Sequence, residues 1–288
     1  MNRLALGTVQ FGLPYGIANK TGQVSRDQAK AMLQLASTGG IDTIDTAMGY
    51  GDSEACLGAI GVQEFKLVTK LPAMPASCAD VSTWVSQTVT ASLLRMDVNS
   101  VYGLLLHKSE QLLGPSGSEL YNALNALKGS GRVQKIGVSI YNPNELVALT
   151  PQYRFDLVQA PFNLFDRRLL STGWMHRLKD DGVEVHTRSA FLQGLLLMAE
   201  ADVPVKFAPW RGLIRRWHKW LEVQDVSAVE ACLAFPMGFP EIDRVVVGAD
   251  SLSHLDQSVR VANSEPISGL PDLQCDDENL INPVNWNT

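Results

Sequence analysis

Eight short apolar runs, of the kind that fills a buried strand, recur along this chain, and helical patterns separate most of them. Strands that alternate with helices run parallel and are joined by right-handed crossovers. Eight such units favour a closed (β/α)8 TIM barrel of the α/β class, and a doubly wound open sheet is the alternative. The predicted strands are Leu4–Gly7, Thr43–Ala47, Lys66–Leu71, Val101–His107, Lys135–Ile140, Leu157–Ala160, Val183–Ser189 and Arg244–Val247.

Helical patterns fill the intervals between these strands. The first begins at Ser25, where Gln28 completes a capping box, and ends at Gly39 and Gly40. The others are Ser53–Gly58, Ala79–Met96, Ser118–Gly129, Asn144–Leu149, Arg168–Asp180, Ala228–Phe235 and Leu252–Ala262.

Length and linker content predict one domain. A barrel of this kind usually needs ~250 residues, and the chain of 288 has no low-complexity linker. We therefore expect residues 1–288 to form a single barrel domain with a C-terminal tail from about residue 265 to 288. The tail is polar and is expected to wrap the barrel or to be partly disordered.

Charge and cysteine content narrow the class of protein. The net charge of −6 is mild and argues against nucleic acid as a partner. No apolar run approaches the ~20 residues that span a bilayer, and the N-terminal stretch lacks the apolar segment of a signal peptide. The four cysteines form no CxxC pair or metal-finger spacing, so we expect reduced thiols, no metal site and a cytoplasmic protein.

Four ionisable side chains lie at, or just beyond, the ends of three predicted strands: Asp45, Tyr50, Lys70 and His107. In parallel barrels the carboxyl ends of the strands meet at one mouth, where the chemistry takes place. Further polar residues follow other strands and should reach the same mouth. These are Ser139, Gln159 with Asn163, Arg188 with Ser189, and Gly248.

The four residues suit proton transfer to a carbonyl oxygen. A free phenol has a pKa near ~10, which is too high for efficient proton exchange at neutral pH, but a neighbouring ammonium favours the phenolate. Lys70 is placed to supply that charge to Tyr50, and Asp45 would keep Lys70 protonated. His107 would bind or orient the substrate oxygen. This set fits a carbonyl reduction in which a cofactor brings the hydride.

Each of these residues also has a purely structural interpretation. Asp45 and Lys70 would then form a salt bridge at the barrel rim, and Tyr50 would anchor a loop. His107 would be a core histidine whose ring nitrogens are hydrogen-bonded within the protein. The joint position of all four at strand ends favours the functional interpretation.

Several strings of the sequence occur, in the same order, in a known family. They are LALGTVQFG, DTAMGYGDSEACLG, VTK, LLLH, GRVQKIGVSIYN, DLVQAPFNLFDR and RVVVGADSLSHL, within Leu4–Val261. The chain resembles the aldo-keto reductases, which implies a barrel that binds NAD(P)H and reduces aldehydes or ketones. The resemblance implies that Asp45, Tyr50, Lys70 and His107 are the catalytic tetrad. It also implies that Ser139 and Gln159 hold the nicotinamide carboxamide.

The remaining cofactor-binding positions depart from the family pattern. Arg188 matches a position that often carries an aromatic side chain stacked on the nicotinamide, and a guanidinium can also stack on a ring. Ser189, Gly248, Ser251 and His254 complete the predicted cofactor-binding set. The family often has basic residues after strand eight that hold the 2′-phosphate, whereas this chain has Asp250. An acidic residue favours a free ribose hydroxyl, so NADH is expected to bind at least as well as NADPH.

Two segments have additional interpretations. The basic and aromatic segment 211–221 is predicted to be an amphipathic helix packed over the barrel, or a border of the substrate pocket that suits an anionic or sugar-like compound. Arg188 either belongs to the exit of strand seven or grips a carboxylate or phosphate at the rim.

The predicted partner is a small carbonyl substrate, and the protein is expected to be a monomer or a small homo-oligomer. One alternative is a cofactor-binding barrel that acts as a sensor or partner subunit with little turnover. Another is a barrel lyase or isomerase without a redox cofactor.

Overall fold

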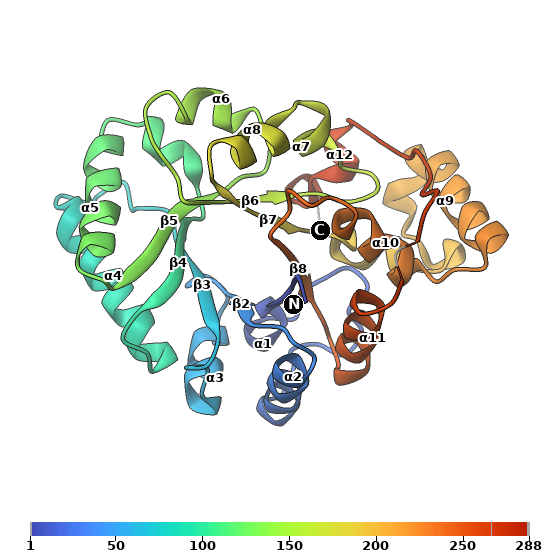
Figure 1. Ribbon diagram of the computed structural model, residues 1–288, viewed down its shortest axis with the longest axis horizontal. Helices are drawn as coiled ribbons and strands as arrows, with labels where there is room; N and C mark the ends of the chain where they lie inside the picture. Colours follow the sequence, from blue (N-terminus) through green and yellow to red (C-terminus); the bar gives the residue numbers. More distant parts are fainter. Residues whose placement is uncertain (1, 266, 287–288) are drawn as a thin grey trace.

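A closed barrel of eight parallel strands forms the centre of the computed structural model, which describes residues 2–265 and 267–286. Neighbouring strands pair in chain order, and β8 pairs with β1 (Figure 1). The predicted (β/α)8 TIM barrel is confirmed, and the open sheet is not. The strands are β1 (Leu4–Gly7), β2 (Thr43–Asp45), β3 (Lys66–Leu71), β4 (Val101–Leu106), β5 (Val133–Ser139), β6 (Leu157–Pro161), β7 (Glu184–Arg188) and β8 (Arg244–Gly248).

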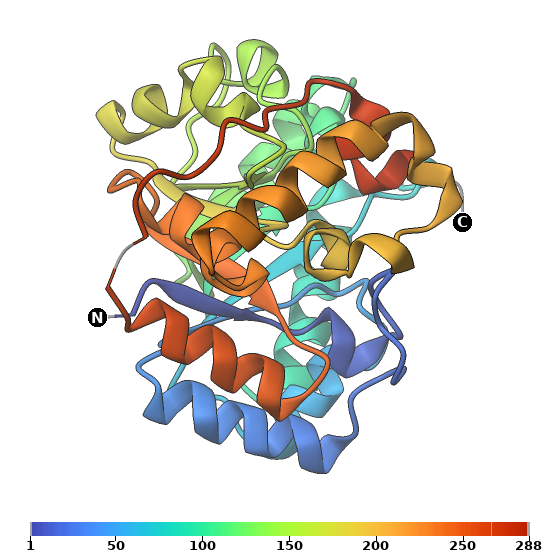
Figure 2. The same cartoon turned by 90° about the vertical axis from the view of Figure 1, so that its right-hand side faces the viewer.

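Helices surround the barrel (Figures 1 and 2). The α-helices are α1 (Val9–Gly12), α2 (Arg26–Thr38), α3 (Ser53–Ile60), α4 (Val81–Met96), α5 (Gly117–Gly129), α6 (Glu145–Leu149), α7 (Arg168–Ser171), α8 (Trp174–Asp180), α9 (Arg211–Gln224), α10 (Ala228–Met237), α11 (Leu252–Ala262) and α12 (Glu278–Ile281). The 3₁₀ turns are η1 (Ser109–Leu113), η2 (Leu192–Leu197), η3 (Glu200–Asp202), η4 (Val205–Trp210) and η5 (Pro283–Asn285).

Local sequence signals set several helix ends. The predicted capping box is present at α2, where the side chains of Ser25 and Gln28 satisfy each other's backbone N–H groups. The predicted helix over 168–180 is instead two helices, α7 and α8. Gly173 separates them with φ +77°, a left-handed conformation that interrupts the helical hydrogen bonds.

The barrel register brings the carboxyl ends of the strands to one level. Gly7 of β1 is paired with Asp45 of β2 on one side and with Gly248 of β8 on the other. Ser139 of β5 is paired with Gln159 of β6. Because parallel strands end at the same edge, side chains that are far apart in the sequence meet above the barrel core.

A long connection follows β7 and carries three 3₁₀ turns before α9. It begins with unusual backbone: Ser189, Leu192 and Gln193 have φ values of +64°, +47° and +53°. Gln193 is tied to the loop before α2, because its carbonyl accepts from Ile17 N at 3.2 Å and its Nε2 donates to Tyr15 Oη at 3.0 Å. Positive φ in non-glycine residues is costly, so tertiary contacts hold this loop in place.

Helix α9 contains the basic and aromatic segment 211–221. Ile214 and Trp217 are buried, and Trp217 Nε1 donates to Leu196 O at 3.0 Å. The predicted amphipathic helix is therefore confirmed, but it packs on the 3₁₀ turns of the connection after β7 rather than directly over the barrel strands.

The C-terminal segment lies across the barrel and packs against it (red in Figures 1 and 2). Leu273, Leu280, Ile281 and Trp286 are buried, and the Trp286 ring makes an edge contact with Phe207, with their centroids 4.9 Å apart. The described part of the predicted tail thus wraps the barrel. Residues 1, 266, 287 and 288, which the predicted domain and tail include, lie outside the described residues.

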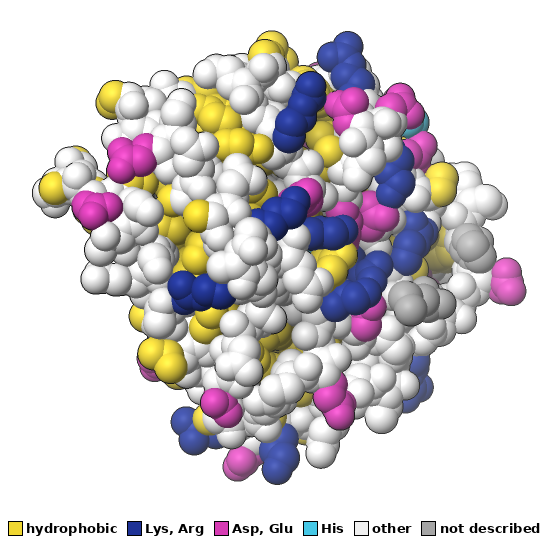
Figure 3. All heavy atoms as spheres, turned by 60° about the vertical axis from the view of Figure 1, so that its left-hand side comes forward, with side chains coloured by type: hydrophobic (Ala, Val, Ile, Leu, Met, Phe, Trp, Pro, Cys, Tyr) yellow, Lys and Arg dark blue, Asp and Glu magenta, His cyan; other side chains and the backbone are white. Residues whose placement is uncertain are grey.

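One face of the molecule carries charges of both signs. On the face shown in Figure 3, basic and acidic side chains are interspersed between small apolar patches. Across residues 2–265 and 267–286, every helix is too short or too polar to cross a lipid bilayer.

Candidate active site

A buried ion pair joins the ends of β2 and β3. Lys70 Nζ donates to Asp45 Oδ1 at 2.6 Å and to Thr46 O at 2.9 Å. The second carboxylate oxygen, Asp45 Oδ2, accepts from Gln159 Nε2 at 2.7 Å. Both charged side chains are almost fully buried, at 1% and 5% exposure. The pair is therefore hydrogen-bonded at both oxygens, which a buried carboxylate requires.

The electrostatic surroundings keep Lys70 protonated. Burial acts to lower the pKa of the Lys70 ammonium, but Asp45 and Tyr50 raise it, and the pKa stays above its ordinary value. A permanent positive charge is thus fixed below the mouth of the barrel.

Tyr50 and His107 lie beside this pair. The turn after β2 carries Tyr50, and its ring centroid is 5.2 Å from Lys70 Nζ. The His107 ring follows β4 and meets the Tyr50 ring edge-on, with centroids 6.0 Å apart and an interplanar angle of 81°. The structure therefore brings the four predicted catalytic side chains together; that they carry out catalysis stays a prediction.

His107 is neutral at physiological pH. Burial, with the positive charges of Lys70 and Arg188, lowers its pKa from 6.5 to about 4. A neutral imidazole can donate one hydrogen bond to a substrate oxygen without adding a charge.

A cavity of about 970 Å³ opens over these four residues. It continues from Tyr50 and His107 past the ends of β5 and β6 to the N-terminal part of α11, where His254 and Ser258 line it. Of the predicted cofactor-binding residues, six line this cavity: Ser139, Gln159, Arg188, Ser189, Gly248 and His254.

The seventh predicted cofactor-binding residue, and one further residue expected at the mouth, do not line the cavity. Ser251 caps α11 instead, because its Oγ accepts from His254 N at 3.3 Å. Asn163, which we also expected at the mouth, donates from Nδ2 to Ser189 O at 3.1 Å and supports the loop after β7.

The cavity wall suits a nicotinamide dinucleotide. It runs from the four predicted catalytic side chains to residues of the N-terminal part of α11, where backbone N–H groups favour a phosphate. Beside it, Gln10 Oε1 is buried and has no hydrogen-bond partner among the described residues. Gly248 packs so closely on Gln10 that a Cβ there would lie 2.7 Å from Gln10 Nε2. In the described part of the chain, no group of His, Cys, Asp or Glu side chains is arranged to hold a metal ion.

Among the wall residues that sequence reasoning missed are Gln10, Tyr15 and Tyr141. Tyr141 follows Ser139 by two residues and so stands at the rim position after β5. That spacing was a usable signal. Tyr15 and Gln10 come from the segment after β1, where no predicted element placed them.

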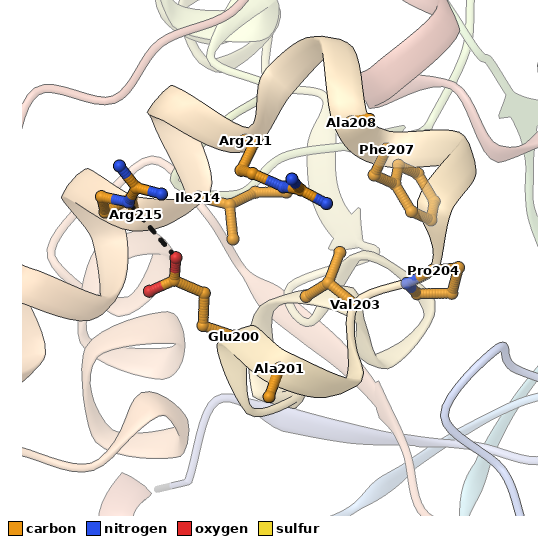
Figure 4. Close-up of a pocket in the computed structure, with 9 residues that line it drawn as sticks. All are labelled: Glu200, Ala201, Val203, Pro204, Phe207, Ala208, Arg211, Ile214 and Arg215. Atoms are coloured by element: carbon orange, nitrogen blue, oxygen red, sulfur yellow. Dashed lines mark hydrogen bonds and ion pairs between the residues drawn. The ribbon is translucent and has the colours of Figure 1, made fainter.

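A second, smaller cavity of about 500 Å³ lies between η3, η4 and α9. Figure 4 shows the side chains of Arg211, Ile214 and Val203 pointing into this cavity. Arg215 Nε forms an ion pair with Glu200 Oε1 at 3.4 Å. Segment 211–221 therefore contributes to this cavity, and none of its residues lines the large one.

A (β/α)8 barrel whose strand ends surround a deep cavity with a buried ion pair is the architecture of a barrel enzyme. A model of the Aldo/keto reductase family matches residues 3–269, so the chain belongs to that family. The resemblance seen in the sequence is confirmed.

The individual proteins that this chain matches share only low sequence identity with it. A 6-dehydroglucose reductase from Agrobacterium fabrum is 31% identical over 160 residues, which are 49% of this chain and 52% of that protein. A 6-dehydroglucose reductase from Novosphingobium aromaticivorans is 28% identical over 145 residues, 45% of this chain and 47% of that protein. The matched region thus spans about half the length of these relatives. The holo form of an aldo-keto reductase from Bacillus halodurans superimposes with a TM-score of 0.74 at 19% identity, covering 92% of this chain and 88% of the other, which shows the same fold.

Proposed function

We propose that this protein is an NAD(P)H-dependent oxidoreductase that reduces an aldehyde or ketone to an alcohol. The observation that carries the proposal is the buried Lys70–Asp45 pair beside Tyr50 and His107, all lining a cavity of about 970 Å³. Membership in the aldo/keto reductase family supports the same reaction.

The four side chains have separate roles in this reaction. When bound, the nicotinamide supplies the hydride to the carbonyl carbon. Tyr50 donates its phenolic proton to the carbonyl oxygen, so the product is an alcohol, and the phenolate then regains a proton from water. Lys70 stabilises the transient phenolate, and Asp45 keeps the Lys70 ammonium charged and fixed. Neutral His107 donates a hydrogen bond to the carbonyl oxygen and orients it.

The residues that would hold the cofactor form a row along the cavity. Ser139 and Gln159, with Oγ and Oε1 3.5 Å apart, present polar groups suited to the nicotinamide carboxamide. Arg188, Ser189, Gly248 and His254 follow along the wall, and Ser251 helps to fix the α11 N-terminus that faces the phosphates.

A sugar-like or anionic carbonyl compound is the proposed substrate. The named activity of the two partial relatives, reduction of 6-dehydroglucose, supports a sugar aldehyde. The test measures the rate of nicotinamide oxidation with each compound of a panel of aldehydes, keto sugars and sugar dialdehydes. Turnover of at least one compound is expected. Binding of the cofactor without turnover of any compound would favour the alternative, a sensor or partner subunit.

Cofactor choice gives a separate prediction. Asp250 lines the cavity just before α11, and burial raises the pKa of its carboxyl group while His254 lowers it. A carboxylate at this place repels a 2′-phosphate, so NADH should bind at least as tightly as NADPH. Dissociation constants from fluorescence titration check this, and Asp250→Ser should improve NADPH binding relative to NADH. A strong NADPH preference in the unaltered protein would contradict it.

A further inference from the structure

The most conspicuous charge in the cavity that the proposed mechanism does not use for proton transfer is Arg188. This residue ends β7 and lines the large cavity with Tyr50 and His107. Among the described residues, no carboxylate lies within salt-bridge distance of its guanidinium, although the side chain is only partly exposed. A cation held at a protein cavity without a counter-ion is costly, which points to a ligand that supplies the negative charge.

Three contacts hold the guanidinium in one orientation. Nη2 donates to Ile140 O at 3.0 Å, and Nη1 donates to Ser189 Oγ at 3.3 Å. The guanidinium carbon lies 4.6 Å from the centroid of the Tyr141 ring, a cation–π distance. These contacts use only part of the donor set of an arginine side chain, so N–H groups remain for a bidentate partner.

The surroundings of Arg188 are positive rather than balanced. Lys70 is already neutralised by Asp45, and Lys108 also approaches the Tyr141 ring, at 5.6 Å from its centroid. The largest charge effects on neighbouring His107 come from Lys70, Arg188, Asp45 and Lys108, three cations against one carboxylate. The end of the cavity next to Tyr50 therefore attracts a negative group.

We propose that Arg188, positioned by Tyr141 and Ser189, binds an anionic group on the substrate, so that the substrates are carbonyl compounds that carry a carboxylate or a phosphate. This inference rests on the proposed reductase function and adds the class of substrate to it. Tyr141 and Ser189 are positioning residues, because they contact Arg188 rather than the reacting atoms.

The kinetic test compares charged and neutral aldehydes of similar size. One pair is 4-oxobutanoate and its methyl ester, and the other is glyceraldehyde 3-phosphate and glyceraldehyde, so that the two pairs distinguish carboxylate from phosphate. The unaltered protein should prefer the charged member of at least one pair in kcat/KM. Arg188→Met should lower the ratio of kcat/KM for the charged member to kcat/KM for the neutral member by about 10- to 100-fold, as expected for a lost charge-assisted hydrogen bond, because any contribution of Arg188 to cofactor binding would affect both members equally.

Two further variants separate the charge of Arg188 from other effects. Arg188→Lys keeps the charge and should retain part of the preference. Arg211→Met removes a positive charge from the second cavity and should leave the preference intact. An equal loss for charged and neutral aldehydes in Arg188→Met would mean that Arg188 serves the cofactor alone, and would overturn the proposal.

A binding measurement keeps the test independent of turnover. Calorimetric titration with succinate in the presence of NADH should show binding to the unaltered protein and to Arg211→Met, and at least tenfold weaker binding to Arg188→Met. If no aldehyde is reduced, the reductase function fails while succinate and inorganic phosphate titrations still test Arg188. Equal binding of both anions by the unaltered protein and by Arg188→Met, or binding of neither, would refute the anion site.

Discussion

At the scale of single residues, the most consequential contact is the one between Lys70 and Asp45. The ammonium is enclosed, and its acceptors are Asp45 Oδ1 and the carbonyl of Thr46. Removal of one partner from such a pair leaves an uncompensated buried charge, whereas removal of both can be nearly neutral. The same contact therefore has a stability role that can be measured apart from any catalytic role.

We expect Lys70→Met to lower the free energy of unfolding by about 3–5 kcal/mol, because Asp45 would be left buried without its cation. The double variant Lys70→Met with Asp45→Leu should regain much of that stability while it stays inactive. Lys66→Met on the same strand is the matched control, since Lys66 pairs with Asp42 at the surface and is 43% exposed. Urea unfolding of the three variants measures the differences. A Lys70→Met protein as stable as the control would contradict the buried-pair argument.

The lowered pKa of His107 predicts a pH effect on stability. Folded His107 stays neutral down to about pH 4, whereas the unfolded chain takes up the proton near pH 6.5. Between these values the unfolded state binds more protons, so stability falls as the pH is lowered from about 6.5 towards 4. His107→Asn should reduce this fall, and the exposed His176→Asn should not. Denaturation at pH 7 and pH 5 gives the comparison, and identical pH dependence in all three proteins would argue against it.

At the scale of elements, the position of Tyr50 depends on how α1 packs against the turn after β2. A Cβ at Gly12 would lie 1.8 Å from Tyr50 O and 2.6 Å from Ser53 N. Only glycine permits this approach, and it fixes the turn that carries the predicted proton donor.

Gly12→Ala should therefore displace the Tyr50 turn, lower the free energy of unfolding by about 1–3 kcal/mol and reduce kcat. Gly212→Ala is the matched control, because Gly212 lies in α9 with open space where its Cβ would be. That variant should be equally active and as stable as the unaltered protein, or more stable by up to about 1 kcal/mol. Thermal and urea unfolding with steady-state kinetics distinguish the two. A Gly12→Ala protein with unaltered kcat would show that the turn is not held by this contact.

Some elements of the site could be predicted from the sequence, and others could not. The strand ends that carry Asp45, Lys70 and Ser139 were predictable, because apolar runs and alternation with helices define parallel strands and their polar ends. The loop after β7 was not, because Leu192 and Gln193 adopt left-handed backbone that their residue types disfavour. Contacts with Tyr15 and Ile17, distant in the sequence, impose that conformation.

At the scale of the whole molecule, barrel closure gathers the site. Strands β2, β3, β5, β6 and β7 each contribute one polar side chain, His107 directly follows β4, and the closed ring makes these strand ends adjacent. The C-terminal segment then covers part of the mouth, and Pro283 and Val284 line the cavity.

The polar composition of this segment did not allow the sequence to distinguish a tail that wraps the barrel from a disordered one, because four buried side chains among many polar ones give no periodic signal. The cation–π contact of Arg188 with Tyr141 was equally beyond the sequence, because it depends on the side-chain directions at the end of β7 and in the loop after β5.

In the proposed reaction Tyr50, supported by Lys70 and oriented with His107, delivers a proton to a carbonyl oxygen. The most direct measurement is the single-turnover rate of nicotinamide oxidation with a reactive aldehyde, compared between the unaltered protein and Tyr50→Phe, with cofactor affinity measured in both. We expect a rate lower by a factor on the order of 10²–10⁴ in Tyr50→Phe with unchanged cofactor affinity. Equal rates in the two proteins would contradict this role of Tyr50.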